Sequence, residues 1–109
     1  MINFNNSIWS ARDPDNILLT TPDSINENCF GFGKSIHPRE DLLQFTNLNN
    51  EKIIDFGFYG DEIELNGKWI VFVVISGNPD AWYNPLERYE FKEFIDGVGK
   101  VQELLNKYT

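Results

Sequence analysis

The residues best suited to catalysis in this sequence lie around its one histidine, His37. Glu40 and Asp41 follow it by three and four residues, so a helix beginning at Pro38 would bring both carboxylates close to the imidazole. A histidine oriented by a carboxylate is the usual arrangement of a general base. The residue before a helix-initiating proline is also an ordinary place for a polar cap. Of these two roles, the sequence favours capping for His37.

A single cysteine, Cys29, is the other reactive side chain. It has no second histidine to activate it and no surrounding nucleophile signature, so we expect a buried thiol. A tetrahedral zinc site would need two carboxylates in addition to Cys29 and His37. The glycines at 31–33 lack the longer pattern of a phosphate-binding loop. We therefore expect no bound metal and no cofactor.

Carboxylate pairs are the remaining candidates for acid–base chemistry. They are Asp13 with Asp15, and Asp61 with Glu62 and Glu64. A glycosidase needs two facing carboxylates in a cleft that holds a sugar, which a chain of 109 residues can hardly supply. The sequence therefore predicts no catalytic residue and no enzyme activity.

The charge balance is strongly acidic, with 17 aspartates and glutamates against 9 lysines and arginines and a formal net charge of −8. This charge repels nucleic acids and anionic membranes, and it attracts basic proteins and speeds their approach. Solubility alone explains the acidity equally well. The composition favours a basic protein partner and argues against nucleic acid or membrane binding.

The features of an exported or membrane protein are missing from the sequence. Its first residues do not resemble a signal peptide, and no apolar run has the length of a membrane span. A single cysteine suits a reducing compartment. We therefore expect a cytoplasmic protein.

Half of the net charge lies in residues 51–66, where five acids are opposed by one lysine. If residues 61–65 form a strand, Glu62 and Glu64 point to the face opposite Asp61. A charged strand edge that discourages aggregation and a binding patch for a basic protein both explain this cluster.

The segment 77–85, GNPDAWYNP, combines turn-forming residues with two large aromatic side chains, Trp82 and Tyr83. Because it follows a central strand, we expect it at the same end of the sheet as the turn at 59–61. Tryptophan and tyrosine are frequent interface anchors, and a partner's arginine can stack on them. The predicted partner-binding residues are Tyr59, Asp61, Glu62, Glu64, Asp80, Trp82 and Tyr83. The competing interpretation is that Trp82 folds over the end of the core.

The scaffold that positions these residues is predicted from the apolar pattern. In the first half, Ile17–Thr20 is a short strand candidate and Cys29–Ile36 a candidate edge strand. A helix is expected over 38–48, because a proline followed by carboxylates suits its first turn. Its apolar face would consist of Leu42, Leu43, Phe45 and Leu48.

The second half has clearer strand signals. Strands are expected at Lys52–Tyr59, 61–65, Lys68–Ser76 and Leu86–Phe91. The dipeptide Asn66-Gly67 is typical of a tight hairpin and should join 61–65 to 68–75. The apolar run from Trp69 to Val74 is typical of a central strand buried on both faces.

The last segment predicts an amphipathic helix over residues 92–108. Its apolar side chains recur at steps of three and four: Phe94, Ile95, Val98, Val101, Leu105 and Tyr108. Gly97 would let this helix lie close to the sheet. The sequence thus predicts a single α+β domain over 1–109, an antiparallel β-meander of about four to five strands with a C-terminal amphipathic helix and a shorter helix near 38–48.

The strand-then-helix segment RYEFKEFIDGVGKVQELL resembles the ending of small acidic bacterial immunity proteins of polymorphic-toxin and contact-dependent growth inhibition systems. The similarity covers about a fifth of the chain. It implies a protein that binds a basic toxin domain and neutralises it by occluding its active site. The favoured class of toxin is a nuclease. A small enzyme or ligand-binding domain that uses His37 or Trp82 is an alternative, as is a regulatory interaction module with an unrelated partner.

Overall fold

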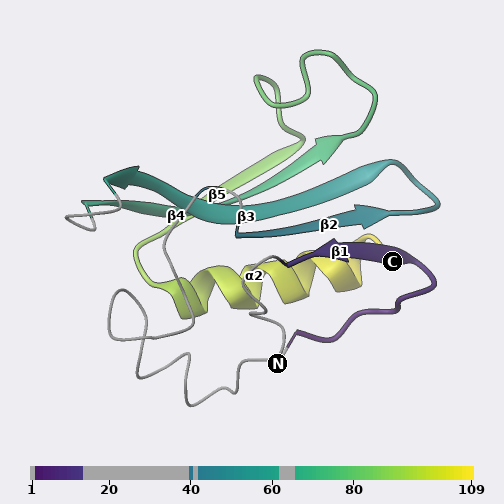
Figure 1. Cartoon of the computed structure of the whole chain (residues 1–109), viewed down its shortest axis with the longest axis horizontal. Coiled ribbons are helices and arrows are strands. Elements are labelled where there is room, and N and C mark those ends of the chain that lie inside the picture. Colours follow the sequence, from purple (N-terminus) through teal and green to yellow (C-terminus); the bar gives the residue numbers. More distant parts are fainter. Residues whose placement is uncertain (1, 14–39, 41, 62–65) are drawn as a thin grey trace.

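The computed structural model describes residues 2–13, 40, 42–61 and 66–109, and these form one sheet and one helix (Figure 1). The elements are β1 (Trp9–Arg12), β2 (Leu43–Asn47), β3 (Lys52–Asp61), β4 (Asn66–Ile75), β5 (Glu87–Phe91) and α2 (Phe94–Lys107). The strands lie in the order in which they occur in the chain, and each is antiparallel to the next. The predicted α+β meander with a C-terminal helix is therefore confirmed.

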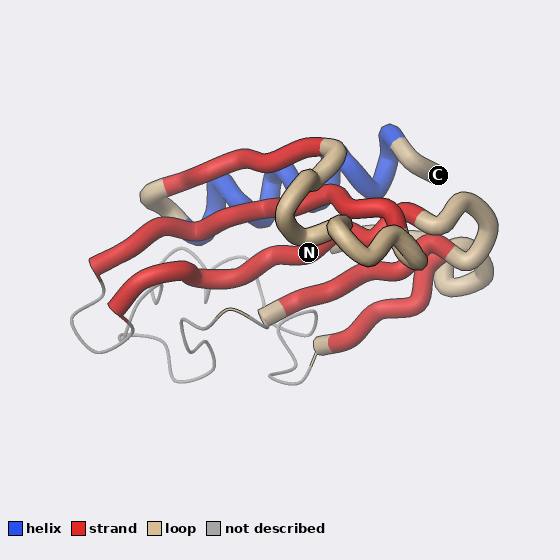
Figure 2. The backbone as a smooth tube through the Cα atoms, turned by 90° about the horizontal axis from the view of Figure 1, so that it is seen from above, coloured by secondary structure: helices blue, strands red, loops and turns tan. Residues whose placement is uncertain are grey.

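The helix α2 lies along one face of the sheet, as Figures 1 and 2 show from two directions. Alternate residues of each strand point to that face, because successive side chains of a strand point to opposite sides. They meet the buried side of α2 in one apolar core. The largest fully buried core side chains are Trp9, Trp69, Phe45, Phe56, Phe58, Phe94, Leu42, Leu43 and Ile54. We call this side of the sheet the helix face and the other side the outer face.

Aromatic rings fill the centre of the helix face. The ring of Trp69 packs against Phe56 at 5.3 Å and against Phe94 of α2 at 4.9 Å, between ring centroids. The predicted central strand is confirmed, since Trp69, Val71 and Val73 are buried on the helix face. Its neighbours Ile70 and Val74 are buried on the outer face as well, and within the run Trp69–Val74 only Phe72 is partly exposed.

Gly97 sets the distance between α2 and the sheet. A Cβ atom added there would lie 2.3 Å from Cε1 of Phe56, closer than real Cβ atoms approach a neighbour. The helix can lie this close only because residue 97 has no side chain, as expected from the sequence. Gly99, two residues on, has nothing within 4 Å of its added Cβ.

The expected helix over 38–48 is wrong in its described part, because Leu43–Asn47 form strand β2. β2 pairs with β1 on one side and with β3 on the other. Its burial alternates with a period of two, with Leu43, Phe45 and Asn47 buried and the residues between them half-buried. Ladder hydrogen bonds to two neighbouring strands outweigh the favourable helix start, which is a local signal only. β1, with its buried Trp9, has no counterpart among the expected elements.

The expected turn at Asn66-Gly67 is also wrong, because both residues belong to β4. Asp61 pairs with Asn66 and Gly60 with Gly67, so β3 and β4 share a continuous antiparallel ladder and residues 62–65 connect them. Gly67 is needed for close packing, since its added Cβ would lie 2.3 Å from the carbonyl oxygen of Tyr59. A ladder of ten residue pairs thus replaces the shorter hairpin expected from the turn signal.

Several expectations fall outside the described residues. They are the strand candidates Ile17–Thr20 and Cys29–Ile36, together with Cys29 and His37 themselves. Among the described residues, α2 is too short and too polar to cross a membrane, and no other helix is present there.

Candidate functional site

A row of side chains crosses the outer face from β2 to β5. Gln44 pairs in register with Asp55, Asp55 with Phe72, and Phe72 with Arg88. Tyr59 lies four residues after Asp55 on the same strand and therefore on the same face. Three strands thus bring an amide, a carboxylate and two aromatic rings together.

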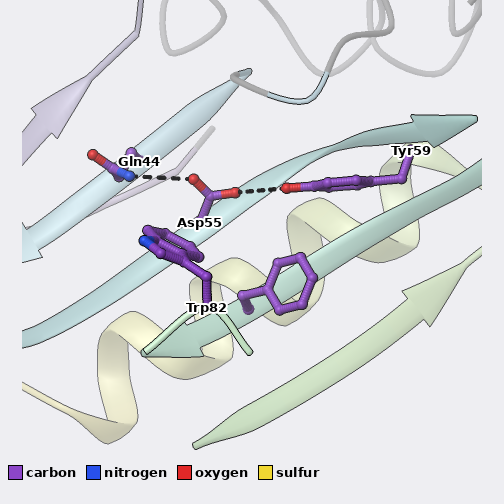
Figure 3. A pocket seen from close by; sticks show the side chains of 5 residues that line it. Gln44, Asp55, Tyr59 and Trp82 are labelled. Atoms are coloured by element: carbon purple, nitrogen blue, oxygen red, sulfur yellow. Dashed lines mark hydrogen bonds between the residues drawn. The ribbon is translucent and has the colours of Figure 1, made fainter. Parts of the chain in front are cut away.

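The loop between β4 and β5 adds a tryptophan to this row. It rises from the face of the sheet opposite α2 (Figure 1). The ring of Trp82 stands against Phe72, with 6.4 Å between ring centroids. Between the loop and the strands lies a cavity of about 350 Å³, lined by Gln44, Asp55, Tyr59, Phe72 and Trp82 (Figure 3).

Among the described residues that line the cavity, Asp55 is the charged one, and only 5% of its surface is exposed. Nε2 of Gln44 donates a hydrogen bond to Oδ2 at 3.3 Å, and the hydroxyl of Tyr59 donates to Oδ1 at 3.4 Å (Figure 3). Asp55 also makes interactions besides these two. A buried carboxylate is tolerated only with such partners. The hydrogen bonds fix its orientation and place a negative charge beside the aromatic rings.

The aromatic rings of the cavity are nearly perpendicular to their neighbours. Tyr59 and Phe72 lie 5.6 Å apart at 79°, and Phe72 and Trp82 meet at 85°. Edge-to-face packing of this kind is the favoured arrangement of aromatic pairs. The guanidinium of Arg88 lies 5.7 Å from the centre of the Phe72 ring, so this ring already contacts a cation.

Gly57 lies between Asp55 and Tyr59 on β3, where another part of the chain comes very close. The backbone of Glu40 passes directly over it, and an added Cβ would lie 1.9 Å from the carbonyl oxygen of Glu40. A side chain at position 57 would therefore displace the chain before β2. The close approach of the Glu40 backbone therefore explains why the second residue of FGFY is a glycine.

The loop that carries Trp82 is held by its own hydrogen bonds. Oδ1 of Asn78 accepts a hydrogen bond from the backbone N–H of Asp80 at 3.0 Å, and the N–H of Ala81 donates to the carbonyl of Asn78 at 3.0 Å. The N–H of Leu86 donates to the carbonyl of Val73 at 2.7 Å, and Ala81 is buried. A turn-rich segment thus becomes a fixed support for aromatic side chains.

The structure separates the predicted partner-binding residues into groups. Tyr59 and Trp82 line the same cavity. Asp80 and Tyr83 are exposed on the loop, Tyr83 at 87%. Asp61 ends β3, and Glu62 and Glu64 fall outside the described residues.

The expectation that the loop shares one end of the sheet with the turn at 59–61 is wrong. β4 begins opposite Asp61 and ends opposite Lys52, so the loop after β4 leaves from the far end of β3. The backbone N–H of Ser76 donates to the carbonyl of Glu51 at this end, at 2.7 Å. Trp82 comes to the same cavity as Tyr59 because the loop folds back over the outer face, not because the two turns are neighbours.

Sequence reasoning missed Gln44, Asp55 and Phe72 as site residues. A period-two pattern in residues 53–59 placed Asp55 and Tyr59 on one face and could have indicated a polar site there. Gln44 could not be found in this way, because it lies in the segment expected to be a helix.

Comparisons with protein families, with curated proteins and with solved structures find no match. The functional inference therefore starts from the geometry of the outer face. Within residues 2–13, 40, 42–61 and 66–109, no three His, Cys, Asp or Glu side chains lie together as metal ligands would.

A second polar cluster, around Glu87, joins α2 to the edge of the sheet. The carboxylate of Glu87 accepts hydrogen bonds from the hydroxyls of Tyr89 and Tyr108, and from Nζ of Lys107 at 3.1 Å. Burial raises the pKa of Glu87, but these hydrogen bonds outweigh it and hold the pKa below its usual value. Because Tyr108 and Lys107 lie at the end of α2 and Glu87 lies on β5, these hydrogen bonds fasten the end of the helix to the strand.

Proposed function

We propose that this protein is an immunity protein that binds a basic toxin domain and neutralises it by occlusion, without catalysis of its own. The observation that carries the proposal is the loop between β4 and β5. It is fixed by internal hydrogen bonds, yet it leaves Trp82 49% and Tyr83 87% exposed. Large aromatic side chains on an ordered support are typical anchors of a protein interface.

The fixed loop favours tight binding. Side chains that are already ordered lose little conformational entropy when a partner binds. Tyr83 needs no rearrangement to reach a partner, and Trp82 is held against Phe72. These two aromatic residues would supply the short-range contacts.

The acidic charge provides the long-range attraction. A net charge of −8 accelerates the encounter with a basic protein. Asp80 lies on the same loop as the two aromatic residues and is exposed. A nuclease is the toxin class that we propose, because its active site binds phosphates and is therefore basic. Such a toxin would be met in the cytoplasm.

A second candidate function is binding of a small ligand, and the cavity beside Trp82 favours it. The cavity of about 350 Å³ falls within the usual size of ligand pockets. An immunity protein and a ligand-binding domain differ in what reaches this face. The first needs the exposed loop, whereas the second needs only the cavity.

The decisive experiment uses the product of the adjacent gene as the candidate toxin. A pull-down with the purified protein should retain it, and co-expression should rescue growth. The double variant Trp82→Ala/Tyr83→Ala should lose both effects while it keeps the melting temperature within a few degrees. Ile95→Ala is the matched control, because Ile95 is an exposed apolar residue on α2, on the other side of the sheet. Rescue by the double variant as strong as by the unmodified protein would refute this binding surface.

A further inference from the structure

The lining of the cavity beside Trp82 restricts what it can bind. Asp55 places a negative charge there and repels an anion. An apolar ligand would bury the carboxylate further without providing a hydrogen bond, which is costly. A cation, in contrast, is attracted both by the negative charge of the carboxylate and by the faces of the aromatic rings.

The arrangement of the rings suits a flat cation. The ring planes of Tyr59 and Trp82 are each nearly perpendicular to that of Phe72. The cavity beside the carboxylate is therefore lined by both the faces and the edges of aromatic rings. A guanidinium group is planar, so its face stacks on a ring while its N–H groups reach a carboxylate at its edge. An ammonium group has no such flat face.

The molecule already shows this chemistry once, on the neighbouring strand. The guanidinium of Arg88 lies over Phe72 and forms an ion pair with Glu90. One aromatic ring and one carboxylate thus hold a guanidinium on the β5 side of Phe72. On its other side, the cavity offers two more rings and Asp55.

We propose that the cavity beside Trp82 is a binding site for a guanidinium group. In the complex, the site takes an arginine side chain of the basic partner, and this part rests on the proposed function. Binding of the group itself does not, and it can be measured with a small probe.

The probe is arginine amide, and its neutral isostere citrulline amide is the control. Titrations followed by NMR should shift the side-chain amide of Gln44 and the indole N–H of Trp82 with arginine amide. Citrulline amide should bind at least about tenfold more weakly, since it lacks the charge that Asp55 attracts. Equal binding of both probes, or shifts confined to other parts of the protein, would overturn the proposal.

Variants test whether the charge of Asp55 in the cavity is responsible for the binding. Asp55→Asn should weaken the binding of arginine amide at least about tenfold. Asp96→Asn makes the same change in net charge on α2, on the other side of the sheet, and should have no effect. Trp82→Phe keeps an aromatic ring and should retain most of the affinity, whereas Trp82→Ala should lose about threefold. If Asp55→Asn fails to fold, the Trp82 pair decides, and unchanged affinity in Trp82→Ala contradicts the site.

A third arm separates this site from the proposed function. Tyr83→Ala should weaken binding of the toxin and leave arginine amide unaffected, because Tyr83 does not line the cavity. Arginine amide should also compete with the toxin. Binding of arginine amide without competition would keep the guanidinium site and refute the arginine of the partner. Failure of arginine amide to bind would refute the site even if the toxin is retained.

Discussion

The two faces of the sheet use alternate residues of the same strands, but they are completed differently. On the helix face, Phe56 and Trp69 are covered by α2, with Gly97 pressed against the Phe56 ring. On the outer face, Asp55 and Phe72 stand beside a cavity under a loop. A regular helix fills the space it covers, whereas an irregular loop held at a few points leaves room. The comparison assigns the main stabilising contacts to the helix face and leaves the outer face for the proposed binding site.

The largest expected effect is on the helix face. Phe56→Ala should lower the free energy of unfolding by about 3–5 kcal/mol, because it removes a fully buried ring and leaves a cavity. Phe72→Ala, on the outer face of the neighbouring strand, should cost only about 1–2 kcal/mol, because its ring is partly exposed. Urea unfolding of the two variants measures both values. Equal losses would mean that the outer face is as much a core as the helix face.

For the affinity of binding, in contrast to stability, the larger effect is expected on the outer face. If the proposed toxin partner binds this face, Trp82→Ala should cost about 2 kcal/mol of affinity for it, mainly through faster dissociation, while its stability changes less than that of Phe56→Ala. Binding kinetics at two salt concentrations, together with a thermal melt, separate the two quantities. If Trp82→Ala unfolds the protein, the tryptophan belongs to the core and the division between the faces fails.

A matched pair of glycines tests how closely the helix face is packed. Gly97→Ala should destabilise the protein by about 1–2 kcal/mol, since overpacking against Phe56 exceeds the gain in helix propensity. Gly99→Ala meets nothing within 4 Å and should stabilise the helix by up to about 1 kcal/mol. Thermal or urea unfolding gives both signs. A stabilising Gly97→Ala would show that α2 can move away from the sheet at little cost.

The smallest expected effect concerns two acids of β5 that point to opposite faces. Glu87 has a lowered pKa, so its stabilising contribution is present above the usual value of 4.5 and is lost as the pH falls through the lower folded value. Glu87→Gln should therefore cost about 1 kcal/mol at pH 7 and progressively less as the pH falls below 4.5. Glu90 pairs with Lys68 and Arg88, which lower its pKa to about 2, but it is exposed to solvent. Glu90→Gln should have the smaller effect at pH 7, and the opposite ranking would contradict this account.

Sequence patterns predicted the parts of the fold that depend on many residues. The apolar run Trp69–Val74 and the helical spacing after Phe94 each extend over several residues, and both elements are present. Local signals failed where pairing decided the outcome. The proline and acids before β2 favour a helix that runs on to residue 48, and Asn66-Gly67 favours a turn, but Leu43–Asn47 and Asn66-Gly67 gain more from strand neighbours that a local pattern does not contain.

The candidate site was only half predictable for the same reason. The aromatic loop and the acidic turn in the sequence point to Trp82 and Tyr59, and both line the cavity. Asp55 acquires its significance from Gln44 and Phe72, which lie beside it across the sheet. Register between strands is a property of the folded chain, so no spacing in the sequence could place these three together.

The order of the elements has a consequence for synthesis of the protein. Among the elements that the structure describes, α2 follows all five strands, and it covers the helix face. A nascent chain that has left the ribosome only as far as β5 can pair its strands, but its aromatic face remains in contact with water. Chaperones bind apolar surfaces of this kind, and strands in this state aggregate. The interval before α2 emerges is therefore the period in which the chain most needs protection.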